Sequence, residues 1–310
     1  MQRITTLTHT AASVLVAAAF AAAATVAVAG PEGGTQKTSY APAGQSGPGA
    51  SSAARTLAGD DSPLVFSAPP RETAQEGSAT YGPIAEYLSQ VTGKQIVYKH
   101  AHNWLTYQTE MLKGGYDLVF DGPHFNGWRI ANLQHNTLVK APGDHQFVIV
   151  TKSENDKISE VKQLSGRPVC AMASPNLGTL TLLNQFDNPA RQPLVVSVDG
   201  WENIYNALLA GRCAAAVLPK LNLGKFDPTG QATRTLYQGR ALPNQAFSAG
   251  PRITPEDQRK IARALLAPEA ATVTALLRET YAFQGGFVSA GKDEYLSAAG
   301  ALKDVWGYDR

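Results

Sequence analysis

The sequence has few cysteines, little net charge and none of the short motifs that mark common catalytic sites. Its 310 residues include two cysteines, and 27 Lys+Arg against 25 Asp+Glu give a net charge of +2 without a long basic run. A nucleic-acid partner is therefore not expected. The patterns Gly-x-Ser-x-Gly, His-Glu-x-x-His and Gly-x-x-x-x-Gly-Lys-Ser/Thr are also missing. We expect a binding protein with no catalytic residue, metal or cofactor, and keep an enzyme as an alternative.

The N-terminal segment has the pattern of a secretory signal peptide. Residues 1–29 contain one charged residue, Arg3, and an Ala/Val-rich run that ends in Ala27-Val28-Ala29. We expect cleavage after residue 29 and a periplasmic location. The alternative is an uncleaved membrane anchor, since the run approaches the ~20 residues that span a bilayer. Alanine is weakly apolar, which favours cleavage.

A flexible linker is predicted for residues 30–62. This stretch is rich in Gly, Pro, Ser, Ala, Gln and Thr and has almost no large apolar residues. Such a composition cannot bury enough surface to fold. The long linker also leaves open a tethered sensory or adaptor protein, if the signal is not cut.

From residue 63 onward, short apolar runs alternate with helical patterns. This order predicts an α/β fold with two successive units, each containing three parallel strands flanked by helices. In the first unit the predicted strands are 64–67, 95–98 and 116–120, and the predicted helices 81–91 and 104–113. In the second unit the predicted strands are 167–172, 194–198 and 213–218, and the predicted helices 158–164, 179–186 and 201–210. Three helical patterns close the chain, at 255–266, 269–278 and 292–305.

The two units are expected to form two lobes. Lobe 1 would comprise 63–146 and 248–310, and lobe 2 would comprise 147–247. The segments 145–151 and 244–249 would be the two crossover strands that act as a hinge. Ligands of such sheets bind beyond the carboxyl ends of the strands. We therefore expect the loop of Asp121, Gly122, Pro123 and His124 to face the ligand.

Five motifs carry a family resemblance. They are Pro83-Ile-Ala-Glu-Tyr-Leu-Ser89 with Thr92-Gly-Lys94, Gly115-Tyr-Asp-Leu-Val-Phe-Asp-Gly-Pro123, Leu164-Ser-Gly-Arg-Pro-Val169, Ala207-Leu-Leu-Ala-Gly-Arg212, and Ile253-Thr-Pro-Glu256. In order and spacing they resemble the periplasmic substrate-binding proteins of ABC transporters, specifically the phosphate/phosphite/phosphonate-binding (PhnD-like) group. The resemblance implies a two-lobed type II periplasmic binding fold, an exported monomer, and delivery of a small solute to a permease and its ATPase.

The resemblance also places the ligand-binding residues. They are Trp104, Asp121 and His124 in the first lobe, and Ser174, Asn176, Thr179, Trp201 and Lys220 in the second. The family's hydroxyl-rich loop, which holds an anion at a helix N-terminus, is reduced here to Ser174 and Thr179. The expected ligand is a small oxyanion or organophosphonate. Two Trp faces near Asp121 would instead suit a cationic or zwitterionic amine, whereas Lys220 favours an anion.

Several of these residues have simpler explanations. Asp121 is also a good residue to cap the turn at Gly122, His124 could be a solvated loop residue, and Trp104 and Trp201 could be core residues. His100 and His102 have a spacing that could hold a metal ion, although an exposed loop explains them as well.

Cys170 and Cys213 fall in the first and third predicted strands of lobe 2. In the strand order 2-1-3 these two strands are neighbours, about 4.8 Å apart, which is within reach of a disulfide. Export permits the bond. The alternative is two reduced core cysteines.

Overall fold

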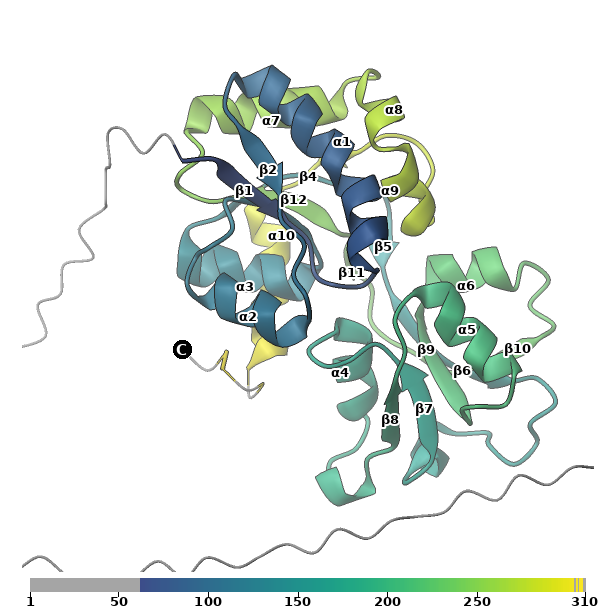
Figure 1. Cartoon of the computed structure of the whole chain (residues 1–310). Helices are drawn as coiled ribbons and strands as arrows, with labels where there is room; N and C mark the ends of the chain where they lie inside the picture. Colours follow the sequence, from purple (N-terminus) through teal and green to yellow (C-terminus); the bar gives the residue numbers. More distant parts are fainter. Residues whose placement is uncertain (1–61, 304, 306, 309–310) are drawn as a thin grey trace, which may run out of the picture. The chain divides into compact units, whose positions relative to one another are not determined.

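The computed structural model describes residues 62–303, 305, 307 and 308, all within one compact unit of the chain. The predicted signal peptide and all of the linker except Ser62 lie outside the described residues. Two large sheets organise this part of the chain, one of six strands and one of five. Each sheet carries the helices of one lobe (Figure 1).

The first lobe is built on the sheet β13-β4-β12-β3-β1-β2. Its strands are β1 (Leu64–Ser67), β2 (Ile96–Tyr98), β3 (Leu118–Asp121), β4 (Asn136–Lys140), β12 (Ala246–Ala249) and β13 (Val288–Ser289). β1 pairs in parallel with β2 and β3, and the other three strands join in antiparallel fashion. The connecting helices are α1 (Ala74–Thr92), α2 (Trp104–Leu112) and α3 (Pro123–Leu133).

Local sequence signals explain where these helices begin and end. Thr73 and Glu76 form a capping box at the start of α1, and Gly93 ends that helix in the left-handed conformation (φ 69°). The predicted start at residue 81 was therefore seven residues too late. Pro123 occupies the first turn of α3, where a missing N–H costs nothing. His124 consequently lies on a helix, and not in the predicted loop.

Side chains of alternate strand residues enter two apolar clusters on opposite faces of the first sheet. Leu118 and Phe120 pack with α1 and with α7 (Pro255–Leu266), whereas Val119 packs with α2 and α3. This alternation is the two-residue period of a strand. Because both faces are covered, the sheet is buried and its strand ends are the places where polar side chains gather.

The second lobe has the strand order β10-β6-β9-β7-β8. Its strands are β6 (Phe147–Lys152), β7 (Pro168–Ala171), β8 (Leu194–Ser197), β9 (Ala215–Pro219) and β10 (Thr233–Gln238). β7 pairs in parallel with β8 and β9, while β6 and β10 run antiparallel. Its helices are α4 (Leu177–Leu183), α5 (Trp201–Leu209), α6 (Lys220–Phe226) and the short turns η1 (Val161–Leu164) and η2 (Pro189–Arg191).

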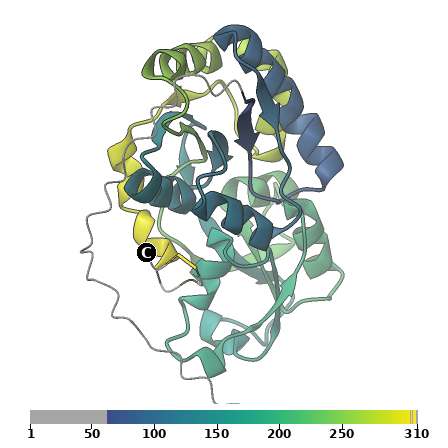
Figure 2. The same ribbon diagram turned by 60° about the vertical axis from the view of Figure 1, so that its left-hand side comes forward.

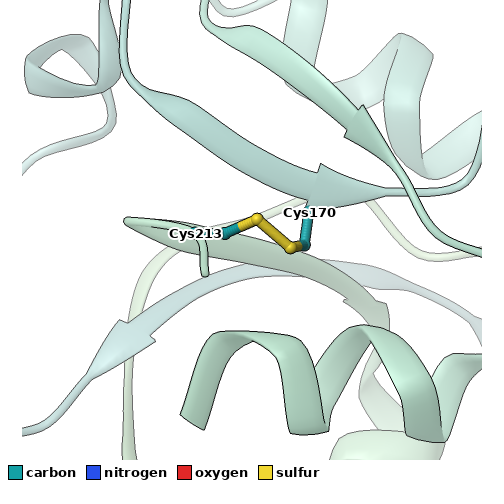
Figure 3. Close-up of a disulfide and its surroundings, with 2 residues drawn as sticks. All are labelled: Cys170 and Cys213. Carbon is teal, nitrogen blue, oxygen red and sulfur yellow. A yellow bond between two sulfur atoms is a disulfide. The ribbon is translucent and has the colours of Figure 1, made fainter. Parts of the chain in front are cut away.

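The predicted disulfide is confirmed. Cys170 on β7 is bonded to Cys213, two residues before β9, with the two Cα atoms 5.6 Å apart (Figure 3). β7 and β9 are the first and third parallel strands of the lobe, and they are neighbours as the 2-1-3 order requires.

The two sheets are joined by a small ladder. β5 (Asp144–His145), on the way from β4 to β6, pairs with β11 (Leu242–Pro243), on the way from β10 to β12. The chain thus crosses between the lobes twice through one pair of short strands, whereas the predicted crossover segments 145–151 and 244–249 lie mostly in β6 of the second sheet and in β12 of the first. Among the described residues, no helix is long and apolar enough to cross a membrane.

The C-terminal segment returns to the first lobe. After α7 come α8 (Ala270–Val273), α9 (Ala275–Thr280), α10 (Lys292–Leu296) and η3 (Ala299–Leu302). The last two pack against α3 (Figures 1 and 2). The sequence predicted single helices at 269–278 and 292–305, and each is broken into two short pieces.

Candidate functional site

Loops at the carboxyl ends of the parallel strands of the two lobes touch each other. His124, in the first turn of α3, has its Nε2 3.2 Å from the backbone oxygen of Pro175, in the loop between β7 and α4. The backbone N–H of Gly200, before α5, donates to the backbone oxygen of Arg71, between β1 and α1 (3.2 Å). These are the edges at which ligands of parallel sheets bind.

A buried ionic cluster surrounds Asp121, the last residue of β3. This side chain has 0% exposure. Its Oδ2 accepts from Arg129 Nη1 at 2.6 Å and from the Tyr107 hydroxyl. Its Oδ1 accepts from the N–H of Gly122 at 2.7 Å and from Arg71 Nη2 at 3.4 Å. Asp121 is therefore fully engaged by groups of its own lobe.

Arg71 lies in a loop and makes three contacts, with the hydroxyl of Tyr281, the ring of Tyr281 and the carboxylate of Asp121. Its Nη1 donates to the Tyr281 hydroxyl at 3.0 Å, and its guanidinium lies 5.8 Å from the centre of that ring. The Tyr281 hydroxyl in turn lies 3.2 Å from that of Tyr81. Burial alone would lower the pKa of Arg71, but Tyr281 and Asp121 raise it above its ordinary value. Arg71 thus stays charged, and its Nε is buried with no hydrogen-bond partner.

The charge of this cluster is positive. Arg71 and Arg129, at 4% and 1% exposure, form ion pairs with one carboxylate, that of Asp121. The neighbouring Glu72 has a buried, unpartnered Oε1, and burial raises the pKa of this carboxyl to about 7. At neutral pH the Glu72 carboxyl is therefore partly protonated. Its negative charge offsets the positive charge of the second guanidinium only in part. A buried excess of positive charge attracts an anion.

Two neutral histidines border the cluster. Burial, assisted by the positive charge of Arg71, lowers the pKa of His124 and of His145 to about 3. Because a carbonyl oxygen can only accept, the Nε2 of neutral His124 carries the proton and donates to Pro175. His145 Nε2 lies 3.4 Å from the amide nitrogen of Gln245.

A small void lies beside the cluster. It measures about 10 Å³ and is lined by residues of both lobes and of the segments between them, namely Asp144, His145, Gln146, Trp201, Pro219, Leu221, Asn222, Asn244 and Tyr281. That is room for about one water molecule. A larger ligand therefore needs the lobes to separate first.

The structure brings Asp121, His124 and Trp201 near this region. Trp201 lines the void and packs edge-on against Phe147. Trp104 is buried and stacks on Phe125, with its ring nitrogen unpartnered among the described residues.

The other predicted residues of lobe 2 do not present polar groups to the cluster. Thr179 donates its hydroxyl to the backbone oxygen of Met172, and the side-chain oxygen of Asn176 caps Gly178 N at 2.9 Å. Ser174 and Lys220 have exposed side chains.

Arg71, Arg129, Tyr107, Tyr281 and Gln245 were missed by sequence reasoning. One of them could have been found: Arg71 follows the end of β1 just as Asp121 ends β3, so the rule that selected Asp121 also covers it. Arg129 gave no comparable signal, because it lies eight residues beyond Asp121 inside a helix that was not predicted.

The described residues contain no group of three or more His, Cys, Asp or Glu side chains that could hold a metal ion. His100 instead has its Nδ1 3.2 Å from the Tyr98 hydroxyl.

Comparison with known proteins gives concordant results. Residues 66–295 match the family model "ABC transporter, phosphonate, periplasmic substrate-binding protein". A stretch of 125 residues is 26% identical to the phosphate-import protein PhnD of Mycolicibacterium smegmatis, and the match spans 37% of this chain and 38% of that protein.

Two solved structures are similar in fold. PhnD1 of Prochlorococcus marinus (MIT 9301), solved with methylphosphonate, has a TM-score of 0.62 and 14% identity, over 79% of this chain and 99% of that one. A binding-protein component of an ABC phosphonate transporter from Pseudomonas aeruginosa has a TM-score of 0.59 and 14% identity, over 77% and 84% of the two chains. At such identities the structural likeness shows the type II fold alone.

Proposed function

Because the chain belongs to the family of periplasmic substrate-binding proteins of phosphonate ABC transporters, we propose that it captures a small phosphorus oxyanion between its two lobes. The ligand class is phosphonate, phosphite or phosphate. The bound protein then delivers the ligand to an ABC permease and its ATPase. Binding without turnover is the whole activity in this proposal.

The observation that carries the proposal is the buried pair of arginines at the ligand-facing edge of lobe 1. Arg71 and Arg129 share one carboxylate, Asp121, and Arg71 retains an unpartnered N–H. Arginine is the preferred side chain for phosphoryl oxygens, because its planar N–H groups match their geometry. Arg71 contacts the ligand in this proposal, while Asp121 and Arg129 fix its position.

The second lobe completes the site by closing over it. Trp201 lines the void between the lobes. The His124 side chain already contacts the backbone oxygen of Pro175, and the backbone oxygen of Arg71 accepts from the N–H of Gly200. The ladder of β5 and β11 is the hinge. The ligand stabilises the closed form because it contacts both lobes at once.

The structure weighs against a cationic ligand. An ammonium group would need a free carboxylate, yet both oxygens of Asp121 are occupied by guanidinium, hydroxyl and backbone donors. Trp104 and Trp201 each pack on a neighbouring Phe. The Trp-lined amine site is therefore the weaker alternative.

The remaining parts of the proposal follow from the family. The protein acts as a periplasmic monomer, released when the signal peptide at residues 1–29 is cut, with residues 30–62 as a linker. The predicted boundary at 247/248 falls inside β12 (Ala246–Ala249), a strand of the first sheet, so we place 63–146 and 246–310 in lobe 1 and 147–245 in lobe 2.

The proposal is tested with the exported protein by isothermal titration with phosphate, phosphite and methylphosphonate, and with choline as the cationic comparison. At least one phosphorus oxyanion should bind, and at a hundred times its dissociation constant it should stabilise the protein by about 2.7 kcal/mol. Saturable binding of choline with none of the oxyanions would overturn the assignment. Absence of binding for the whole panel would also contradict it.

A further inference from the structure

A side chain of lobe 2 caps a helix of lobe 1. The amide nitrogen of Asn222, on α6, donates to the backbone oxygen of Thr280, the last residue of α9, at 3.0 Å. Asn222 is buried, with 3% exposure. The same two helices also meet at the surface, where Lys225 Nζ lies 3.7 Å from Glu279 Oε1. The end of α9 is therefore a point at which the two lobes touch.

The turn that follows α9 explains why this end takes a cap from outside. The N–H groups of Ala282 and Phe283 donate to the backbone oxygens of Glu279 and Arg278, at 3.2 and 3.1 Å, in a Schellman arrangement. A helix leaves its last carbonyl oxygens without partners inside the helix. The oxygen of Thr280 is the next in this row, and the amide from α6 supplies its donor.

The same turn is strained. Ala282 has a φ of 54°, in the left-handed region that helix ends usually fill with glycine. A residue with a Cβ keeps such a conformation only where the contacts around it fix the backbone. The geometry of this turn therefore depends on its neighbouring contacts, and the cap at Thr280 is one of them.

Tyr281 connects the cap to the buried arginine. It lies between Thr280 and Ala282, so the cap and the strained turn together set the direction of its side chain. Its hydroxyl accepts from Arg71 Nη1 at 3.0 Å, its ring centre lies 5.8 Å from the guanidinium, and it lines the void between the lobes. A contact made by lobe 2 is thus linked to Arg71 through one residue of lobe 1.

We propose that Asn222 is a positioning residue of the ligand site. When the lobes close, its bond to Thr280 fixes the end of α9, and with it the Tyr281 side chain that orients Arg71 towards the oxyanion. This inference rests on the proposed function, and it names the contact through which closure of lobe 2 reaches the arginine. The arginine holds the ligand at full strength only after closure, because the bond forms only when α6 meets α9.

The first test measures association and dissociation rates in Asn222→Ala, with whichever of phosphate, phosphite and methylphosphonate binds the wild type most tightly. Loss of a contact made only after closure should raise the dissociation rate about three- to tenfold and leave the association rate within about twofold. The matched control is Asn132→Ala, because Asn132 donates the same kind of bond to the oxygen of Trp128, at 2.8 Å, inside lobe 1. Equal dissociation rates in the two variants overturn the proposal.

A double-mutant cycle separates positioning from direct contact, because Asn222 also lines the void. Tyr281→Phe keeps the ring and removes the hydroxyl that accepts from Arg71. If Asn222 acts through Tyr281, adding Asn222→Ala to Tyr281→Phe should weaken binding by less than about twofold more. Fully additive losses would place Asn222 against the ligand, or make it a contact that only holds the lobes together, and either contradicts the positioning role.

A measurement without ligand separates this inference from the proposed function. Cysteines placed at the exposed positions Lys225 and Glu279 are joined by a short bismaleimide, which holds α6 against α9. In this crosslinked protein Asn222→Ala should speed hydrogen exchange of the N–H groups of residues 281–283 at least about threefold. Unchanged exchange contradicts the inference, whether or not an oxyanion binds. Faster exchange in a protein that binds none of the three oxyanions refutes the proposed function alone. Asn222→Ser, whose side chain is one bond shorter, takes the place of Asn222→Ala in every arm if the alanine variant does not fold, with the same expected results.

Discussion

The ligand-facing edges of the two lobes are built from different chemistry. In lobe 1 the strand ends supply Arg71 and Asp121, and α3 adds His124 and Arg129, all of them buried. In lobe 2 the corresponding loops touch lobe 1 through backbone groups of Pro175 and Gly200, and through Trp201 at the void.

This difference assigns separate tasks to the lobes. In our proposal lobe 1 determines the charge and the orientation of the bound ligand, because both buried arginines and the unpartnered Nε of Arg71 belong to it. In the same proposal lobe 2 covers the site and contributes shape and backbone contacts. The disulfide between Cys170 and Cys213 lies within the sheet of lobe 2. The hydroxyl of Thr179, at the start of α4, donates to the backbone oxygen of Met172 in the same lobe. Substitutions at the two edges should therefore have different consequences.

The largest effect is expected from breaking the charge balance of lobe 1. Asp121→Asn leaves two buried guanidinium groups without their carboxylate, and loss of one partner of a buried ion pair costs about 3–5 kcal/mol. Urea unfolding measures this loss. The matched control is Asp187→Asn in lobe 2, whose exposed side chain is 3.9 Å from Lys162. That change should cost less than about 1 kcal/mol, and equal losses in the two variants would contradict the contrast.

Removing the disulfide tests the structural role of lobe 2. The bond closes a loop with a sequence separation of 43 residues, and its loss in Cys170→Ser with Cys213→Ser should lower stability by about 2–4 kcal/mol. Affinity for methylphosphonate should change little under conditions where the variant is folded. A large loss of affinity with unchanged unfolding would show that the bond shapes the site.

A smaller, pH-dependent effect is expected at Glu72. Burial raises its pKa from an ordinary 4.5 to about 7 in the folded protein, so the folded state favours the protonated form. Stability from this group is complete below about pH 4.5 and is lost as the pH rises through about 7.

Glu72→Gln should therefore stabilise the protein above pH 7 and have little effect below pH 4.5. Thermal unfolding of both proteins across this range measures the difference. If Glu72→Gln stabilised the protein more below pH 4.5 than above pH 7, the raised pKa of Glu72 would be contradicted.

Much of the scaffold could be predicted from the sequence, because its signals are local. The apolar run 64–67 coincides with β1 and the pattern at 255–266 with α7. The pairing of Cys170 with Cys213 followed from strand order. The helix α3 was missed because Gly122-Pro123 also reads as a turn, although proline is favoured at a helix start.

The site was predicted less well than the scaffold, for a physical reason. Asp121 was selected for its place at a strand end, but its partners come from a loop 50 residues earlier and a helix position 8 residues later. Such partners are set by packing, which one sequence does not reveal. Lys220 was selected from the family resemblance, and its side chain is exposed.

The central claim is that Arg71, held by Asp121 and Tyr281, binds an oxyanion between the lobes. Its most direct test is the affinity of methylphosphonate for Arg71→Gln, with Arg191→Gln, an exposed arginine of lobe 2, as the control of equal charge change. The account predicts at least about a hundredfold loss in Arg71→Gln and less than about a twofold change in Arg191→Gln. Equal affinities in the two folded variants would contradict it.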